Sequence, residues 1–316
     1  MKISLIIPCY NEEESIDLLY KEICLVLEEL KRFDIEIIFV DDGSKDNTLD
    51  RILKISEEDN KVKYVSFSRN FGKEAAVYAG FYSASGDYIG LLDADLQHPP
   101  KALIPMIEAL EFDDYDIAAA RRINRKGEKK GYSFCAKSFY KLINRTFQVK
   151  IEDGAQDFRV MKRKVVEAIL NMPEYHRFSK GIFSWVGFKT KWFEHENVER
   201  VNGTTKWSFR KSCGYAIDGI VSFSTMPLRI ALCIGTIASL LGFLYVSYII
   251  LRTLIYGADI PGFPTLVSFI LIMNGFILLS LGIVGEYIAK IFTEIKHRPL
   301  YIIDKTNVEV GEIKSK

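Results

Sequence analysis

The chain has 316 residues, of which 48% are hydrophobic and 26% charged, so it exceeds one average domain and predicts a catalytic-sized unit joined to something smaller. Its net charge of +1 hides a basic block over residues 121–150, in which only Glu128 is acidic. Such a block favours an anionic partner, either phosphate or an anionic membrane surface, and we expect no nucleic acid partner. The five cysteines show no metal-ligand spacing, which argues against a cysteine-based metal site and fits a reducing compartment.

Four apolar segments rich in β-branched residues, 3–9, 35–40, 62–67 and 88–92, alternate with helical patterns. The alternation predicts an open, mostly parallel sheet with helices on both faces. A further helix over residues 101–110 and a strand over 116–120 follow. The apolar periodicity of residues 133–147 predicts an amphipathic helix that can lie against a membrane surface.

Polar and acidic side chains follow the predicted strands at their carboxyl ends, where such sheets bind ligands. The fourth strand leads into Asp93, Asp95 and Gln97, whose oxygens are suitable ligands for Mg²⁺ or Mn²⁺. An ordinary acidic turn is the alternative. We expect His98, which precedes two prolines, to serve packing rather than ligation. The chain has neither GxGxxG after its first strand nor GxxxxGK[ST], so a site for a nucleotide and a metal-bound diphosphate is favoured over a Rossmann or P-loop site.

Two long uncharged segments, residues 230–251 and 260–285, predict transmembrane helices, because each can cross about 30 Å of hydrocarbon at about 1.5 Å per residue. Two helices buried in a soluble core are the alternative. No secretory signal is expected, since the first apolar run is short and leads into glutamates. We expect both chain ends in the cytoplasm, because basic residues lie outside the helix pair: Arg210, Lys211, Arg229, Lys290, Lys296 and Arg298.

Five motifs together resemble a known family: SLIIPCYNEEESI, FVDDGSKDNT, SRNFGKEAAVYAGF, GDYIGLLDADLQHPP and RVNGTTKW. They are similar to inverting family 2 glycosyltransferases of the GT-A fold, and within them to the polyisoprenyl-phosphate glycosyltransferases, namely dolichol-phosphate mannose synthase and the bactoprenol glucosyl transferases. The resemblance implies a GT-A-type open, mostly parallel α/β sheet with interfacial helices and two C-terminal transmembrane helices.

The resemblance also implies roles for individual residues. The base and ribose of the nucleotide are assigned to Pro8, Tyr10, Glu12, Val40 and Asp42. The metal and diphosphate are assigned to Asp93, Ala94, Asp95 and Gln97, with Asp95 and Gln97 as the direct ligands. The acceptor phosphate is assigned to Arg121, Lys137, Ser138, Arg200 and Lys206, although the spacing around Lys137 and Ser138 departs from the mannose-synthase pattern. For Asp41, bracing of the following turn is favoured over nucleotide contact.

The segment IEDGAQDFRVM resembles the one in which the bacterial enzymes carry a proposed catalytic base, here Asp157. A phosphomonoester has a second pKa of about 6 and is largely ionised at neutral pH, so it hardly needs a base. Asp157 is therefore either a base or a residue that orients the acceptor. Arg159 is either positioned by Asp157 or simply its ion-pair partner.

These patterns divide the chain into a catalytic domain (1–207), an interfacial helix (208–227), a transmembrane hairpin (228–290) and a tail (291–316) whose role the sequence does not indicate. The expected protein is an integral membrane enzyme of the bacterial plasma membrane that transfers a hexose, first of all glucose from UDP-glucose, to undecaprenyl phosphate. A homo-oligomer and a downstream flippase are the expected protein partners. The rivals are a processive polysaccharide synthase and a non-catalytic membrane scaffold for a flippase.

Overall fold

In the computed structural model the described residues are 1–122, 151–195, 221, 224–257 and 262–308. They form two compact units. The first contains the N-terminal part of the chain together with residues from His297 onward, and the second spans Ile220–Lys296.

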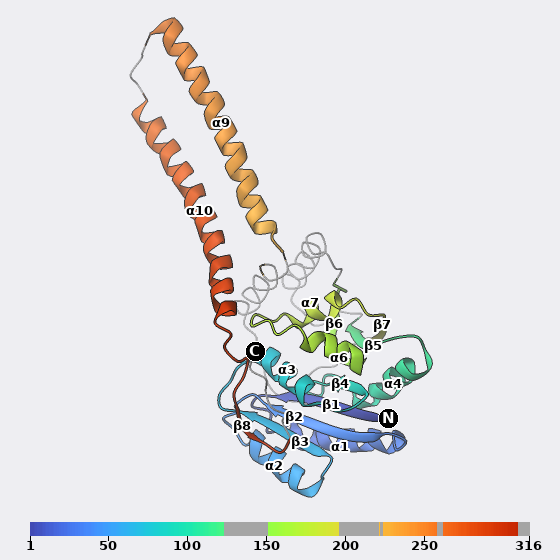
Figure 1. Ribbon diagram of the computed structural model, residues 1–316. Coiled ribbons are helices and arrows are strands. Elements are labelled where there is room, and N and C mark those ends of the chain that lie inside the picture. Colours follow the sequence, from blue (N-terminus) through green and yellow to red (C-terminus); the bar gives the residue numbers. More distant parts are fainter. Residues whose placement is uncertain (123–150, 196–220, 222–223, 258–261, 309–316) are drawn as a thin grey trace. The chain divides into compact units, whose positions relative to one another are not determined.

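The first unit is built on an eight-stranded sheet with the order β7-β5-β6-β4-β1-β2-β3-β8 (Figure 1). Strands β1 (Lys2–Cys9), β2 (Asp34–Asp41), β3 (Val62–Phe67) and β4 (Tyr88–Leu91) pair with one another in parallel. They confirm the predicted parallel sheet. Strands β5 (Ile117–Arg122) and β7 (Thr190–His195) pair in parallel, whereas β6 (Ala155–Lys162) is antiparallel to both β4 and β5.

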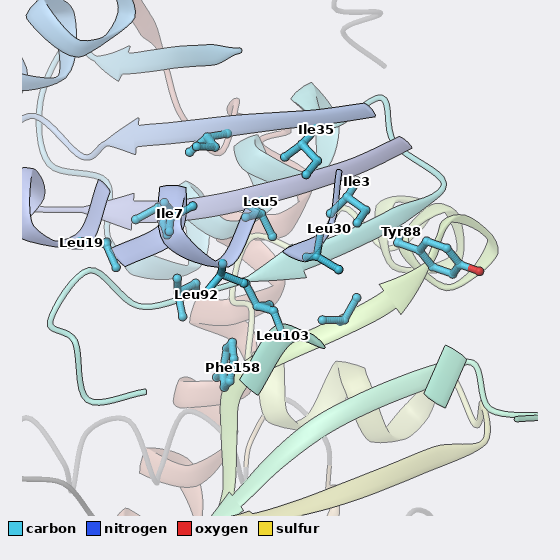
Figure 2. Packing of buried hydrophobic residues seen from close by; sticks show 14 of the residues in the cluster. Ile3, Leu5, Ile7, Leu19, Leu30, Ile35, Tyr88, Leu92, Leu103 and Phe158 are labelled. Carbon is cyan, nitrogen blue, oxygen red and sulfur yellow. The ribbon is translucent and has the colours of Figure 1, made fainter. Parts of the chain in front are cut away.

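Helices cover both faces of this sheet, because alternate residues of the central strands are apolar on both sides. On one face, Ile3, Leu5 and Ile7 of β1 pack with α1 (Ile16–Glu29), α2 (Thr48–Glu58) and α4 (Leu103–Phe112) in one buried cluster. Figure 2 shows Leu5, Leu92, Leu103 and Phe158 in this layer. The short 3₁₀ helix η1 (Pro100–Ala102) leads into α4.

The opposite face is covered by α3 (Lys73–Ser83), α6 (Arg163–Leu170) and α7 (Ser179–Trp185). Helix α3 lies so close to β1 that a Cβ on Gly80 would come within 2.2 Å of the Ile6 side chain. The small residues of α3 therefore allow it to pack directly on the strands that carry the site.

The last strand, β8 (Ile303–Thr306), pairs antiparallel with β3 and closes that edge of the sheet. The backbone N–H of Ser68 donates to the carbonyl of Ile302 at 3.0 Å, and the Tyr301 ring stacks on Phe67 with centroids 4.9 Å apart. Residues 303–306 of the tail, which sequence reasoning left without a role, are thus part of the catalytic sheet.

The second unit contains two long apolar helices, α9 (Met226–Tyr256) and α10 (Phe263–Ile295). Met226–Tyr256 and Ile272–Ile295 are each long and apolar enough to cross a membrane, and neither has a window buried inside the protein. Helix α9 extends beyond the predicted segment 230–251 at both ends, whereas α10 begins inside the predicted segment 260–285 and continues past its end to Ile295. The predicted amphipathic helix at 133–147 and most of the one predicted at 208–227 lie outside the described residues, and α9 already begins at Met226.

Candidate active site

The candidate site lies where β1, β2 and β4 reach their carboxyl ends and antiparallel β6 begins. Cys9 pairs with Asp41, and Leu91 pairs with Arg159, so the residues just beyond β4 come next to the start of β6. Arg121 at the end of β5 pairs with Ala155 of β6. Sheet pairing therefore brings the residues predicted to bind the nucleotide sugar to the same edge of the fold as Asp157 and Arg121.

The loop after β1 is tied to the segment after β2 by hydrogen bonds from its backbone N–H groups to side-chain hydroxyls. The N–H of Asn11 donates to Ser44 Oγ at 2.9 Å, and the N–H of Glu12 donates to Thr48 Oγ1 at 2.8 Å. Asn11 has a positive φ of 53°, a conformation that costs free energy in most residues and is tolerated best by Asn and Asp. The segment with Pro8, Tyr10 and Glu12 is therefore held in a fixed shape beside β2.

Both aspartates at the end of β2 are buried and hydrogen-bonded. Asp41 accepts from the N–H of Ser44 at 3.1 Å and from Ser66 Oγ at 2.9 Å, which is the bracing role expected for it. Asp42, 3% exposed, accepts from the N–H groups of Phe71 and Gly72 at 2.7 and 2.9 Å and from Asn70 Nδ2 at 2.9 Å. Asp42, assigned by resemblance to the nucleotide, thus also fixes the loop between β3 and α3.

Burial raises the pKa of Asp42 to about 6, while the N–H donors of Phe71 and Gly72 act in the opposite direction. The adjacent turn requires glycine at position 43, where φ is +66° and a Cβ would lie 2.4 Å from the backbone of Arg69. The DDGS motif therefore brings two loops into direct backbone contact, and Val40 before it is fully buried.

The segment after β4 presents its carboxylates on a constrained turn. Leu96 has a positive φ of 57°, and the N–H of Gln97 donates to Asp95 Oδ1 at 3.2 Å. Ala94 is buried, so the backbone is anchored between two polar side chains. His98 is buried and stacks on Phe158 with ring centroids 5.1 Å apart, in keeping with its expected packing role.

A divalent cation fits the donor set of this turn. Mg²⁺ and Mn²⁺ prefer oxygen ligands, and Mg²⁺ in nucleotide sites is commonly held by one or two carboxylates together with substrate phosphates. Asp95 and the Gln97 amide supply such oxygens. No cluster of three or more His, Cys, Asp or Glu side chains suited to a metal occurs within the described part of the chain, so phosphate oxygens of a ligand would have to complete the coordination.

Lys73, the first residue of α3, connects this turn to β6. Its Nζ lies 2.6 Å from Asp93 Oδ1 and 2.7 Å from Asp157 Oδ2. Burial alone would raise the pKa of the Asp157 carboxyl, but the Lys73 ammonium and the nearby Lys180 hold that pKa well below its usual range. Sequence reasoning missed Lys73, although its place just beyond β3, in the motif SRNFGKE, puts it on the same edge of the sheet.

Arg159 does not pair with the Asp157 carboxylate. Its guanidinium donates to the backbone carbonyls of Asp157 at 3.0 Å and Gln156 at 2.5 Å, and it lies 3.5 Å from the centroid of the Phe183 ring. Burial lowers its pKa to about 10. Arg159 therefore fixes the backbone around Asp157, and the Asp157 carboxylate forms its ion pair with Lys73.

A cavity of about 300 Å³ opens beside this group, between α7 and the sheet. Charged, polar and aromatic side chains share its wall: Glu152, Ala155, Arg159, Lys180, Phe183, Ser184, Phe188, Thr190 and Trp192. Arg121, assigned to the acceptor phosphate, is held by Glu152 at 2.7 Å. The other residues assigned to the acceptor, Lys137, Ser138, Arg200 and Lys206, lie outside the described residues.

A mostly parallel sheet with a DxD carboxylate pair beyond a central strand defines the class of GT-A-like glycosyltransferases. A family model described as glycosyl transferase family 2 matches residues 4–170, and one described as the GtrB C-terminal hairpin matches residues 226–291. The chain belongs to glycosyl transferase family 2.

Similar proteins match over nearly the full length. A bactoprenol glucosyl transferase of Shigella phage SfII is 42% identical over 97% of this chain and 99% of its own length. A prophage bactoprenol glucosyl transferase homolog of Escherichia coli K12 is 43% identical over 96% of this chain and 99% of its own length. Among solved structures, glucosyl-3-phosphoglycerate synthase of Mycobacterium tuberculosis with Mn²⁺ and UDP-glucose aligns with a TM-score of 0.46 at 16% identity, covering 70% of this chain and 77% of that chain.

Proposed function

We propose that this glycosyltransferase moves a hexose, glucose in the first place, from a UDP-sugar to undecaprenyl or another polyprenyl phosphate at the cytoplasmic face of the bacterial plasma membrane. The proposal rests on one observation: Asp93 and Asp157 contact the same residue, Lys73, so the DxD turn and the IEDGAQDF segment lie side by side. The names of the bactoprenol glucosyl transferases support glucose and a polyprenyl lipid, and the matched hairpin supports a membrane-held acceptor.

The proposed chemistry is a single in-line displacement. An oxygen of the lipid phosphate attacks the anomeric carbon from the side opposite the nucleoside diphosphate, the bond to the diphosphate breaks, and the configuration inverts. A phosphomonoester with a second pKa of about 6 is already ionised at neutral pH. Asp157, kept ionised by Lys73, is a weak proton acceptor, so we assign it the task of orienting the acceptor.

The residues on the donor side have complementary tasks. The loops with Pro8, Tyr10, Glu12, Val40 and Asp42 would hold the base and ribose. A Mg²⁺ or Mn²⁺ ion held by Asp95 and Gln97, with Asp93 and Ala94 beside them, would neutralise the charge that develops on the leaving diphosphate.

On the acceptor side, Arg121, Lys137, Ser138, Arg200 and Lys206 would bind the lipid phosphate by charge-assisted hydrogen bonds. The membrane hairpin would keep the crevice at the surface where the lipid resides, which replaces a three-dimensional search by proximity. A homo-oligomer and transfer of the product to a flippase complete the proposal.

Purified full-length protein with radiolabelled UDP-glucose, Mn²⁺ and a short-chain polyprenyl phosphate tests this function. We expect label to enter the lipid extract and to require Asp95. A matched set of other UDP- and GDP-sugars identifies the donor. The proposal fails if no nucleotide sugar labels the lipid.

Two alternatives make different predictions. A processive polysaccharide synthase of this fold would carry QxxRW, which this sequence lacks, and would form polymer rather than a lipid with one sugar. A non-catalytic scaffold would leave lipid glycosylation unchanged when Asp95→Ala replaces the wild-type protein in cells.

A further inference from the structure

The contact of Lys73 with two carboxylates joins three separate elements of the catalytic unit. Lys73 begins α3, Asp93 follows β4, and Asp157 lies in β6. The side chains remain 46%, 25% and 23% exposed, respectively. The bridge is therefore partly open to solvent, which distinguishes it from an ion pair sealed in the core.

Two other cations, Arg159 and Lys180, lie near the bridge and act on Asp157 electrostatically, but neither forms a direct ion pair with its carboxylate. Arg159 donates to backbone carbonyls rather than to the Asp157 carboxylate. Lys180 lines the neighbouring cavity and forms no salt bridge with another described residue. Among the described residues, Lys73 is thus the cation in direct contact with both carboxylates, while Lys180 and Arg159 attract Asp157 from farther away.

The position of Lys73 is set by the donor side of the crevice. The N–H of Gly72, directly before Lys73, donates to Asp42 Oδ2 at 2.9 Å, and the N–H of Phe71 donates to Asp42 Oδ1 at 2.7 Å. Asp42 therefore fixes the start of α3, and through it the place of the Lys73 ammonium. A continuous series of contacts runs from the end of β2 to Asp157.

We propose that Lys73 is a positioning residue that holds the Asp157 carboxylate beside Asp93 and so couples the donor side of the site to the acceptor side. This inference rests on the proposed transfer to a lipid phosphate. Its ammonium fixes the direction of Asp157, and it balances the negative charge that accumulates when a diphosphate and a second phosphate meet two carboxylates.

A double-mutant cycle tests whether Lys73 acts through Asp157. We expect Lys73→Met and Asp157→Asn each to lower kcat about 100-fold with less than about threefold change in the donor KM, and the double variant to resemble either single one. Lys73→Arg should restore about a tenth or more of the wild-type rate. Lys54→Met, on the exposed face of α2, is the matched control and should retain full activity. Multiplicative losses in the double variant overturn the proposal.

A second measurement needs no turnover and separates positioning from damage to the fold. Mn²⁺ binding in the presence of UDP, followed by electron paramagnetic resonance, should become about three- to tenfold tighter in Lys73→Met, because a cation no longer competes at Asp93. General damage to the fold would instead weaken Mn²⁺ binding. Thermal melting identifies a variant that does not fold, and Lys73→Gln is then used in place of Lys73→Met.

Unchanged or weaker Mn²⁺ affinity in a folded variant overturns the role of Lys73, as does wild-type protein that binds no Mn²⁺. If Mn²⁺ affinity rises as expected while wild-type protein glycosylates no lipid, the proposed function fails and the competition of Lys73 at Asp93 stands.

Discussion

Asp42 combines a buried carboxyl group with N–H donors that fix a loop of the site, and this combination has a consequence for stability. Because burial raises its pKa from 3.8 to about 6, the folded protein holds a proton on Asp42 at pH values where the unfolded chain has released it. The contribution of Asp42 to the free energy of unfolding should therefore decrease as the pH rises from about 4 to 6.

The corresponding experiment compares thermal melting of wild-type protein and Asp42→Asn in detergent across this range. The wild type should lose on the order of 2 kcal/mol relative to the variant between about pH 4 and 6. Parallel pH profiles of the two proteins would show that Asp42 does not titrate there.

Glu36 in β2 shows the opposite behaviour at the other end of the sheet. It is 2% exposed, accepts from Ser4 Oγ at 2.6 Å, and pairs with Lys2 and Lys63 at 2.9 and 2.8 Å. Although burial would raise its pKa, these partners lower it to about 2. Its stabilising contribution is therefore present above about pH 4.5 and is lost as the pH falls towards 2.

Glu36→Gln should lower the free energy of unfolding at neutral pH by about 2–4 kcal/mol, because two lysines lose their buried partner. The loss should shrink below about pH 4.5, because there the unfolded chain binds a proton on Glu36 while the folded protein, with a pKa of about 2, does not. Chemical denaturation at pH 7 and pH 3 measures both effects. An equal loss at the two pH values would contradict an electrostatic origin. Asp34→Asn, in an exposed position of the same strand, is a suitable control.

The residues that could be identified from the sequence differ physically from those that could not. Asp93 and Asp95 could be predicted because the carboxyl ends of parallel strands meet at one edge and carry short motifs, whereas Asp157 was assigned only through its resemblance to a family motif. Lys73 and Glu36 could not, because their roles depend on partners that only tertiary packing brings within reach. A charged residue in a helix or strand is ordinarily solvated, and nothing in the local pattern marks these two as exceptions.

At the level of elements, the parallel strands were predictable from their apolar runs, whereas β8 was not. Its sequence IDKT is short and polar, and it pairs with a strand more than two hundred positions earlier in the chain. Its partner β3 is a parallel strand, so the antiparallel pairing depends on how the chain returns from α10. Only the assembled sheet shows that the β3 edge is covered.

Tyr301, just before β8, connects this strand to the donor loop. Its ring stacks on Phe67, and Phe67 makes an edge-to-face contact with Phe71, whose N–H donates to Asp42. Tyr301→Ala should lower the free energy of unfolding by about 2 kcal/mol and weaken UDP binding severalfold, because the loop loses its support. Calorimetry with UDP measures the second effect.

Ile302→Ala is the matched control, because the Ile302 side chain is 52% exposed and should matter little. If Tyr301→Ala binds UDP as tightly as this control, the C-terminal strand stabilises the sheet without supporting the donor loop.

At the scale of the whole molecule, the pairing of β8 with β3 bears on how the helix pair is oriented in a membrane, without any use of the basic residues that flank the hairpin. The N-terminal catalytic residues and the segment from His297 onward form one compact unit, while α9 and α10 together form the other. If α9 crosses a bilayer, the chain must return through α10 for β8 to reach β3, so we predict that the two helices cross as a pair. This agrees with the expectation from the basic residues outside the hairpin, and it predicts the catalytic unit and β8 on the same side.

Cysteine accessibility tests this arrangement. In a variant whose native cysteines are replaced by serine, Gly257→Cys at the end of α9 should react with a membrane-impermeant maleimide added to intact cells. Lys305→Cys in β8 should react only after the cells are opened. Both positions are exposed in the folded protein, so sidedness rather than burial decides the outcome. Labelling of Lys305→Cys in intact cells would place the catalytic unit outside, away from cytoplasmic nucleotide sugars, and would contradict the proposed donor as well as the orientation.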